Sequence, residues 1–117
     1  MTQRGNMTID ISDKELFWVK VHRSEEYIIL AICDQELLGK TLNDSRLNIN
    51  LRIDPLFYGG ELLEFDEIIP LLRKANIVNA IGNKIIRRLS EIGYISSETD
   101  ALEIDGIKHV QILVFEY

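Results

Sequence analysis

Alternation between apolar and polar residues predicts an antiparallel hairpin near the start of the chain. Residues 16–23 alternate, with Phe17, Val19 and Val21 on one face and Trp18, Lys20 and His22 on the other, which is typical of a strand with one buried face. A short polar turn separates them from residues 27–33, whose apolar side chains on both faces predict a strand covered from both sides. Residues 47–53 alternate again and stop before Pro55, so we expect a third strand there.

Two turn signals extend this pattern. Asp34 is placed to cap a single helical turn, which Gly39 would end in a left-handed conformation. Asp105-Gly106 separates two apolar runs, and this dipeptide is a strong signal for a two-residue hairpin. The run after it is apolar on both faces from Val110 to Phe115, which predicts a strand in the centre of the sheet.

Residues 68–90 form the longest helical pattern in the chain. Within it, Val78, Ile81, Ile85 and Leu89 recur at spacings of three and four, as on the buried face of a helix. Asn76 is a good N-cap in the middle of this pattern. We therefore expect two helices with a kink or break between them rather than one long rod.

These elements predict an α+β fold, with a small, mostly antiparallel sheet of about five strands covered by a kinked helical pair. The length of 117 residues suits one domain, which we place at residues 15–117 after a flexible lead-in over residues 1–14. Cys33 is the only cysteine, and neither a secretory signal nor a membrane-length apolar run is present. The sequence therefore predicts a cytoplasmic protein with no membrane association.

The charge distribution adds a candidate function. The net charge of the chain is -6, but residues 68–90 hold five Lys or Arg residues and no Asp or Glu. A basic helix face with amide side chains suits contacts to phosphates, sugars and base edges, so we predict an RNA-binding surface. The simpler alternative is a solvated helix face whose asparagines, including Asn76, brace neighbouring loops. The candidate RNA-binding residues, two of them on the first strand, are Lys20, His22, Asn79, Asn83, Lys84, Arg87 and Arg88.

Two smaller groups of residues suggest other contacts. Trp18, on the polar face of the first strand, could stack a base, although a tryptophan packed under a helix is the simpler interpretation. Adjacent glycines leave main-chain amides uncovered, which makes their loop a candidate anion site, with a tight turn as the alternative. The residues of this candidate anion-binding loop are Lys40, Tyr58, Gly59 and Gly60.

Cys33, Asp34 and His109 are the set of residues that could support nucleophilic catalysis. A cysteine nucleophile needs a nearby base and an electropositive setting, whereas Cys33 ends an apolar strand and is expected to be a small buried hydrophobe. The spacing of the two histidines and one cysteine does not indicate a metal site. We therefore expect no enzymatic activity and no cofactor.

Four motifs occur in order along the chain and together carry a family resemblance. They are CDQELLGK at residues 33–40, FYGGEL at 57–62, ANIVNAIG at 75–82 and HVQI at 109–112. With these motifs the chain resembles a small archaeal protein family catalogued as domain of unknown function 424, over nearly everything from Trp18 to Val114. The resemblance implies an α+β domain from an archaeal cytoplasm, in a family whose members are associated with RNA binding and translation.

The leading hypothesis is an RNA-binding or ribosome-associated module that uses the basic helix face. The alternative is a protein-interaction module, either a homodimer or a subunit of a larger complex, because several aromatic residues are candidates for exposure. These residues are Trp18, Phe57, Tyr58 and Tyr117. An enzyme acting on a small ligand through Cys33, Asp34 and His109 is the third and least favoured hypothesis.

Overall fold

The structure is a computed structural model, and it describes residues 14–114. Its main element is a six-stranded sheet with the order β5-β1-β2-β6-β8-β7, in which β2 and β6 are parallel and all other neighbours antiparallel. The strands are β1 (Leu16–Arg23), β2 (Ile28–Asp34), β5 (Glu61–Glu64), β6 (Ile77–Ile81), β7 (Leu102–Ile104) and β8 (Ile107–Leu113). The α+β class is confirmed, but the sheet is mixed and has six strands. Except for Lys14, the predicted lead-in lies outside the described residues.

Both predicted hairpins are present. β1 and β2 pair antiparallel, with Val19 opposite Ile32. In the β7–β8 turn, Asp105 and Gly106 have φ angles of 51° and 79°, the two positive values that a type I′ turn requires. The last strand lies inside the sheet but not at its centre, because β8 pairs with β6 on one side and with the edge strand β7 on the other, and its Leu113 side chain is exposed.

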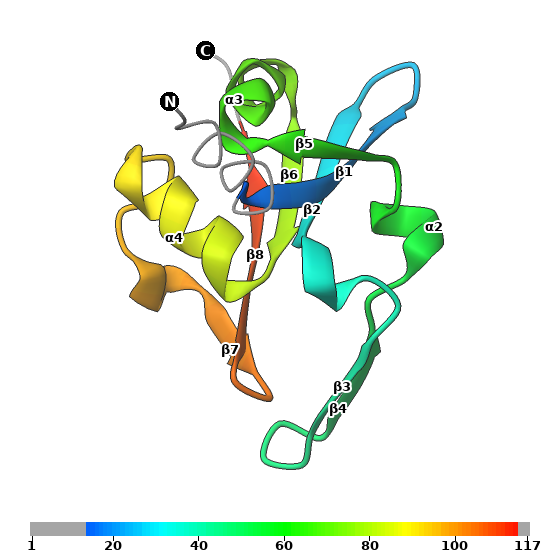
Figure 1. The fold of residues 1–117 in the computed structure, drawn as a ribbon, viewed down its shortest axis with the longest axis vertical. Coiled ribbons are helices and arrows are strands. Elements are labelled where there is room, and N and C mark those ends of the chain that lie inside the picture. Colours follow the sequence, from blue (N-terminus) through cyan, green and yellow to red (C-terminus); the bar gives the residue numbers. More distant parts are fainter. Residues whose placement is uncertain (1–13, 115–117) are drawn as a thin grey trace, which may run out of the picture.

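Two α-helices cover one face of the sheet (Figure 1). They are α3 (Phe65–Lys74) and α4 (Asn83–Glu91), and Ile68, Leu72, Ile85 and Leu89 on them pack into one core with the sheet. The predicted break at Asn76 between two helices is present, but residues 77–81, which were predicted to begin the second helix, form strand β6 instead. Within residues 14–114, no helix is long and apolar enough to cross a membrane.

Shorter elements cover the opposite face. The one-turn helix η1 (Gln35–Leu37) follows β2, and Gly39 has the predicted positive φ of 84°. A two-stranded hairpin of β3 (Thr41–Asp44) and β4 (Ile49–Arg52) then projects from the sheet, and we call residues 41–52 the arm (Figure 1). The predicted strand over residues 47–53 thus pairs in the arm instead of in the main sheet. The short helix α2 (Pro55–Tyr58) returns the chain to β5, and a further helical turn, η2 (Glu98–Asp100), precedes β7.

Candidate ligand-binding cleft

Two of the five cations of residues 68–90, Lys84 and Arg88, are paired with carboxylates of the same chain. The guanidinium of Arg88 lies 3.3 Å from Glu15 and 3.5 Å from Glu91, and it also stacks 4.9 Å above the ring centre of Phe65. The ammonium group of Lys84 lies 3.5 Å from Glu36. The acidic partners come from the residue before β1, from η1 and from α4 itself, so the acid-free segment of the sequence is not an acid-free surface in the fold.

The asparagines of the predicted helix face lie in three different places. Asn76 precedes β6, and its Oδ1 accepts a hydrogen bond of 2.8 Å from the main-chain N–H of Ile28. At the start of α4, Asn83 donates from Nδ2 to the carbonyl of Gly106 and accepts from the N–H of Lys108 at 2.9 Å. Both therefore brace neighbouring segments, as in the simpler interpretation of the sequence. Asn79 lies on β6 and faces the opposite side of the sheet.

The candidate anion-binding loop is a closed turn. The N–H of Gly59 donates to the carbonyl of Pro55 at 2.8 Å, and the N–H of Gly60 donates to the carbonyl of Tyr58 at 3.0 Å. Gly60 also packs so closely on β1 that a Cβ there would overlap the carbonyl oxygen of Val19. These two amides are consequently already satisfied, and Lys40 lies exposed at the base of the arm.

The polar face of β1 is occupied by α2 and the loop after it. The ammonium group of Lys20 donates to the carbonyl of Leu56 at 2.8 Å. His22 contacts the carbonyl of Phe57 through Nε2 at 2.8 Å and stacks on its ring, with 4.8 Å between ring centres. Trp18 is half-buried against the apolar cluster on this face of the sheet, which includes Ile53 and Ile81. This face is therefore a packing surface and does not form a free stacking platform.

The three residues considered for catalysis do not form a catalytic group. Cys33 pairs with Ile81 across β2 and β6, and Ile81 pairs with His109 across β6 and β8. Cys33 and His109 thus lie two strand spacings apart, about 9–10 Å, which is beyond hydrogen-bond reach. Burial, with the nearby Asp34 and Glu36 carboxylates, raises the pKa of Cys33 to about 12, so its thiol stays protonated at neutral pH.

Asp34 has a structural role that the sequence did not indicate. Its side chain does not cap η1 but accepts hydrogen bonds of 2.9 Å from the N–H groups of Lys84 and Ile85, the first turn of α4. Helix α4 has no acidic residue in its own first turn, so a carboxylate from the end of β2 supplies the negative charge there. Burial raises the pKa of Asp34, against the opposing effect of these two hydrogen bonds.

A cleft of about 430 Å³ lies between the arm and the sheet, on the face opposite to α3 and α4. The apolar inner side of the arm forms one wall, β7 forms another, and α2, β6 and β8 supply the polar groups. We call this space the arm cleft. Its lining residues are Ile49, Leu51, Arg52, Asp54, Phe57, Tyr58, Asn79, Leu102, Ile104 and His109.

Three polar side chains on the sheet side of the arm cleft share one acceptor. The hydroxyl of Tyr58 donates to Oδ1 of Asn79 at 2.6 Å, and Nε2 of His109 lies 3.1 Å from the same oxygen. Because an amide oxygen only accepts, His109 carries its proton on Nε2. Nδ2 of Asn79 has no hydrogen-bond partner among residues 14–114 and can donate to a ligand.

Burial keeps this polar group uncharged at neutral pH. It lowers the pKa of His109 and raises the pKa of Tyr58, so the imidazole stays neutral and the phenol stays protonated. Arg52 and Asp54 at the rim lie 3.8 Å apart and balance each other. The arm cleft therefore offers a neutral, oriented set of hydrogen-bonding groups between apolar walls.

The tip of the arm is tied to the β7–β8 turn. Oδ2 of Asp44 accepts a hydrogen bond of 2.7 Å from the N–H of Asp105, whose own carboxylate accepts from the N–H of Asn43 at 3.3 Å. Arg46 also donates to the carbonyl of Glu103 at 3.3 Å. These contacts hold two hairpins together at their tips and close one end of the arm cleft.

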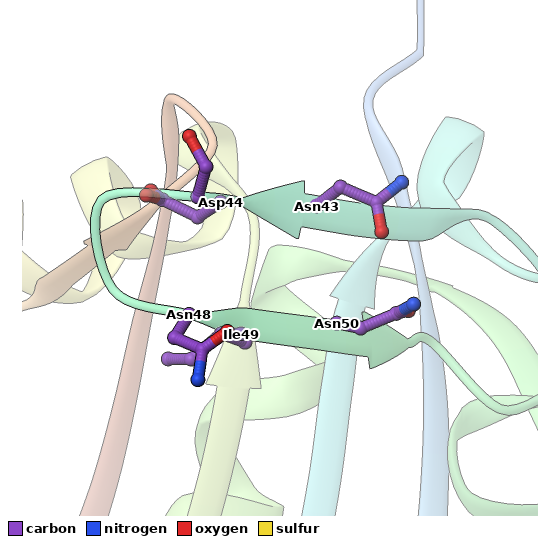
Figure 2. A pocket seen from close by; sticks show the side chains of 6 residues that line it. Asn43, Asp44, Asn48, Ile49 and Asn50 are labelled. Carbon is purple, nitrogen blue, oxygen red and sulfur yellow. The ribbon is translucent and has the colours of Figure 1, made fainter.

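A shallow hollow of about 240 Å³ at the arm tip is a weaker candidate site. Figure 2 shows Asp44 turned away from Asn43 and Asn50, which lie side by side on the two strands of the arm. Asp44 already accepts from main-chain N–H groups, including that of Leu47 at 3.1 Å. The hollow thus borders on amide groups and on a carboxylate that is already engaged, and we assign it no ligand.

Acidification is expected to destabilise the protein through His109. Because the folded state lowers the pKa of His109, its contribution to stability is present above the ordinary value of about 6.5 and is lost as the pH falls below it. Urea unfolding at about pH 7.5 and about pH 5.5 should give a lower midpoint at the acidic pH. His109→Gln should reduce this difference, and an equal difference in the variant would contradict the assignment.

Comparisons with known proteins place the fold without naming a reaction. The model of the family described as "Protein of unknown function (DUF424)" matches residues 22–115. The fold is also similar to the crystal structure of an uncharacterized conserved protein from Methanopyrus kandleri. That likeness has a TM-score of 0.72 and 26% sequence identity, and it covers 87% of this chain and 96% of the other. Comparison with curated proteins gives no match.

Proposed function

The chain belongs to the DUF424 family, whose description assigns no function, and we propose that it is a non-catalytic module that binds single-stranded RNA through the arm cleft. The observation that carries this proposal is the polar group of Tyr58, Asn79 and His109 facing apolar walls. Proteins that recognise single-stranded RNA bury an unstacked base between flat side chains and hydrogen-bond its edge. A neutral cleft with an unused amide donor suits a base better than it suits a charged metabolite.

Cations on the arm are placed to contact the phosphates on either side of such a base. Lys40, Arg46 and Arg52 are all exposed and lie at the base, the tip and the second strand of the arm. Asp44 lies 3.4 Å from Arg46 and Asp54 lies 3.8 Å from Arg52, so both carboxylates offset part of the positive charge of the arm. We expect contacts to two or three phosphates, hence a shallow salt dependence with a log–log slope of about -0.7 per phosphate.

The basic helix face is the second candidate for the same function. Arg73, Lys74 and Arg87 are exposed there, and the first two also lie in the last turn of α3, where cations favour the helix dipole. The carboxylates beside Lys84 and Arg88 weaken the attraction of this face for a polyanion. The two faces lie on opposite sides of the sheet, so variants can separate them.

Ile49→Glu is expected to weaken RNA binding at least tenfold, which corresponds to about 1.4 kcal/mol. Ile49 lines the arm cleft from the inner side of the arm, and a carboxylate there would repel phosphates and exclude a base. The measurement is fluorescence anisotropy with a labelled, mixed-sequence single-stranded RNA of about ten nucleotides, titrated at several salt concentrations.

The matched control is Arg87→Glu, which places the same carboxylate on the exposed face of α4. It should change the affinity less than about threefold, because its change of two charges lies on the opposite side of the sheet from the arm cleft and is screened by salt. Circular dichroism and the urea midpoint show whether both variants remain folded. A larger loss in Arg87→Glu than in Ile49→Glu would move the site to the helix face. The absence of salt-sensitive binding by the wild-type protein would overturn the proposed function.

A further inference from the structure

The outer edge of β8 is left without a partner strand among residues 14–114. β7 pairs only with residues 107–109 of β8, although β8 and its pairing with β6 continue to Leu113. The N–H of Gly82 donates to the carbonyl of Lys108 and the N–H of Val114 donates to the carbonyl of Asn76, both at 2.8 Å. The main-chain N–H and C=O groups of the even-numbered residues of β8 therefore point toward β6. In an antiparallel ladder, the N–H and C=O groups of Gln111 and Leu113 must then point outward.

This edge lacks the charges that protect the other edges of the sheet. The part of β1 beyond β5 carries Lys20, His22 and Arg23, and the edge strand β5 begins and ends with a glutamate. Residues 110–114 read Val-Gln-Ile-Leu-Val, without a charge or a proline. Uncharged, unpaired edges of this kind are ready templates for the addition of another strand.

We propose that a second copy of the chain docks here, with the two β8 strands antiparallel and related by a two-fold axis. The register that satisfies the outward groups is centred on Ile112. It places Gln111 of each copy opposite Leu113 of the other, and each of these two pairs exchanges two main-chain hydrogen bonds. The same two residues on both copies thus supply four hydrogen bonds, and the sheet continues from one copy into the next.

Exposed apolar side chains around this edge would be buried in the contact, in addition to the main-chain hydrogen bonds. Leu113 is 54% exposed and Val114 37% exposed, and both border a hollow of about 350 Å³ together with Tyr27, which is 52% exposed. A second copy would cover these side chains. Although each chain has a net charge of -6, the paired residues 110–114 carry no charge, so the two strands do not repel each other there.

The size of this surface sets the expected affinity. Five paired residues and a few apolar side chains per copy bury less than the roughly 800 Å² per partner of a standard interface. The dimer should therefore be weak, with a dissociation constant between about 10 and about 100 μM. It would form without RNA, since residues 110–114 of the β8 edge do not line the arm cleft.

The test is sedimentation velocity of the RNA-free full-length chain over a wide concentration range. The wild-type protein should shift from monomer to dimer as its concentration rises. Leu113→Lys, which adds a charge to the open edge, should remain monomeric with an unchanged urea midpoint. Leu56→Lys is the matched control at an exposed leucine on α2, and it should dimerise as the wild type does.

Two results would overturn the proposal. One is a wild-type protein that remains strictly monomeric up to about 1 mM, far above the expected dissociation constant. The other is a Leu113→Lys variant that dimerises as well as the wild type, because the interface would then lie elsewhere. Neither result concerns RNA binding, so the failure of this proposal and the failure of the proposed function remain distinguishable.

Discussion

Gly82→Ala is expected to lower the free energy of unfolding by about 3 kcal/mol or more, and to leave much of the protein unfolded at moderate urea concentration. Gly82 lies between β6 and α4 with φ of 132° and ψ of 142°, a conformation that side chains strongly disfavour. A Cβ at this position would also overlap the carboxylate of Asp34, which caps α4. The variant must therefore strain the backbone and displace the cap together.

Gly93→Ala is the matched control for this prediction. Gly93 also has a positive φ, of 76°, but a Cβ there would meet no atom within 4 Å. Its replacement should cost only the left-handed backbone strain of about 1 kcal/mol. If urea unfolding gave similar losses for Gly82→Ala and Gly93→Ala, the overlap with the Asp34 carboxylate would have no energetic weight, and our description of this junction would be wrong.

Asp34→Ala is expected to destabilise the fold by about 2–3 kcal/mol. The Asp34 side chain is 2% exposed, so its loss leaves the N–H groups of Lys84 and Ile85 without their acceptor at a site that water reaches poorly. Helix α4 has no capping side chain of its own to replace it. The urea midpoint of the variant, compared with that of the wild type, measures this loss.

Asp54→Ala provides the comparison for Asp34→Ala. Asp54 caps the four-residue helix α2 by accepting from the N–H of Leu56 at an exposed position, so its loss should cost about 1 kcal/mol or less. The double variant Asp34→Ala/Gly82→Ala gives a further check. Removal of the carboxylate also removes the overlap. The double variant should therefore lose less unfolding free energy than the sum of the losses in the two single variants. Full additivity would contradict a direct contact between the two positions.

The local part of the fold could be predicted from the sequence. The alternation in residues 16–23 and the apolar run before Asp34 together predicted one hairpin, and the Asp105-Gly106 turn predicted another; the structure contains both. These signals depend on neighbours along the chain, and the two hairpins pair segments that are adjacent in sequence. The same holds for the left-handed conformation of Gly39.

Residues 77–81 show where the periodic pattern was misleading. The apolar spacing across residues 78–89 fits one helix, but it combines a short buried strand with a separate amphipathic helix. A five-residue apolar run can fit either structure, and the β-branched residues of 77–81 between Asn76 and Gly82 favoured a strand. Gly82 was the decisive signal, since its conformation ends β6 and permits the close approach of Asp34.

The arm cleft could not be predicted, because its parts come from distant segments. The hydrogen bond between Asp44 and Asp105 joins residues 61 positions apart, and the hydrogen bond between Tyr58 and Asn79 joins residues 21 positions apart. The sequence indicated that Ile49 and Leu51 face inward, but not that they face a cleft instead of the main sheet. Likewise, the carboxylates that pair with Lys84 and Arg88 lie mostly outside the basic segment.

The most direct test of the account is to map where RNA touches the protein. Isotope-labelled protein would be titrated with the single-stranded oligomer and followed by amide NMR spectroscopy. We predict saturable shifts of the Asn79 side-chain amide and of the main-chain amides of Tyr58, Leu51 and His109, which surround the arm cleft. Shifts confined to α3 and α4, around Arg73 and Arg87, or no shifts at all, would contradict the assignment of the arm cleft as the RNA-binding site.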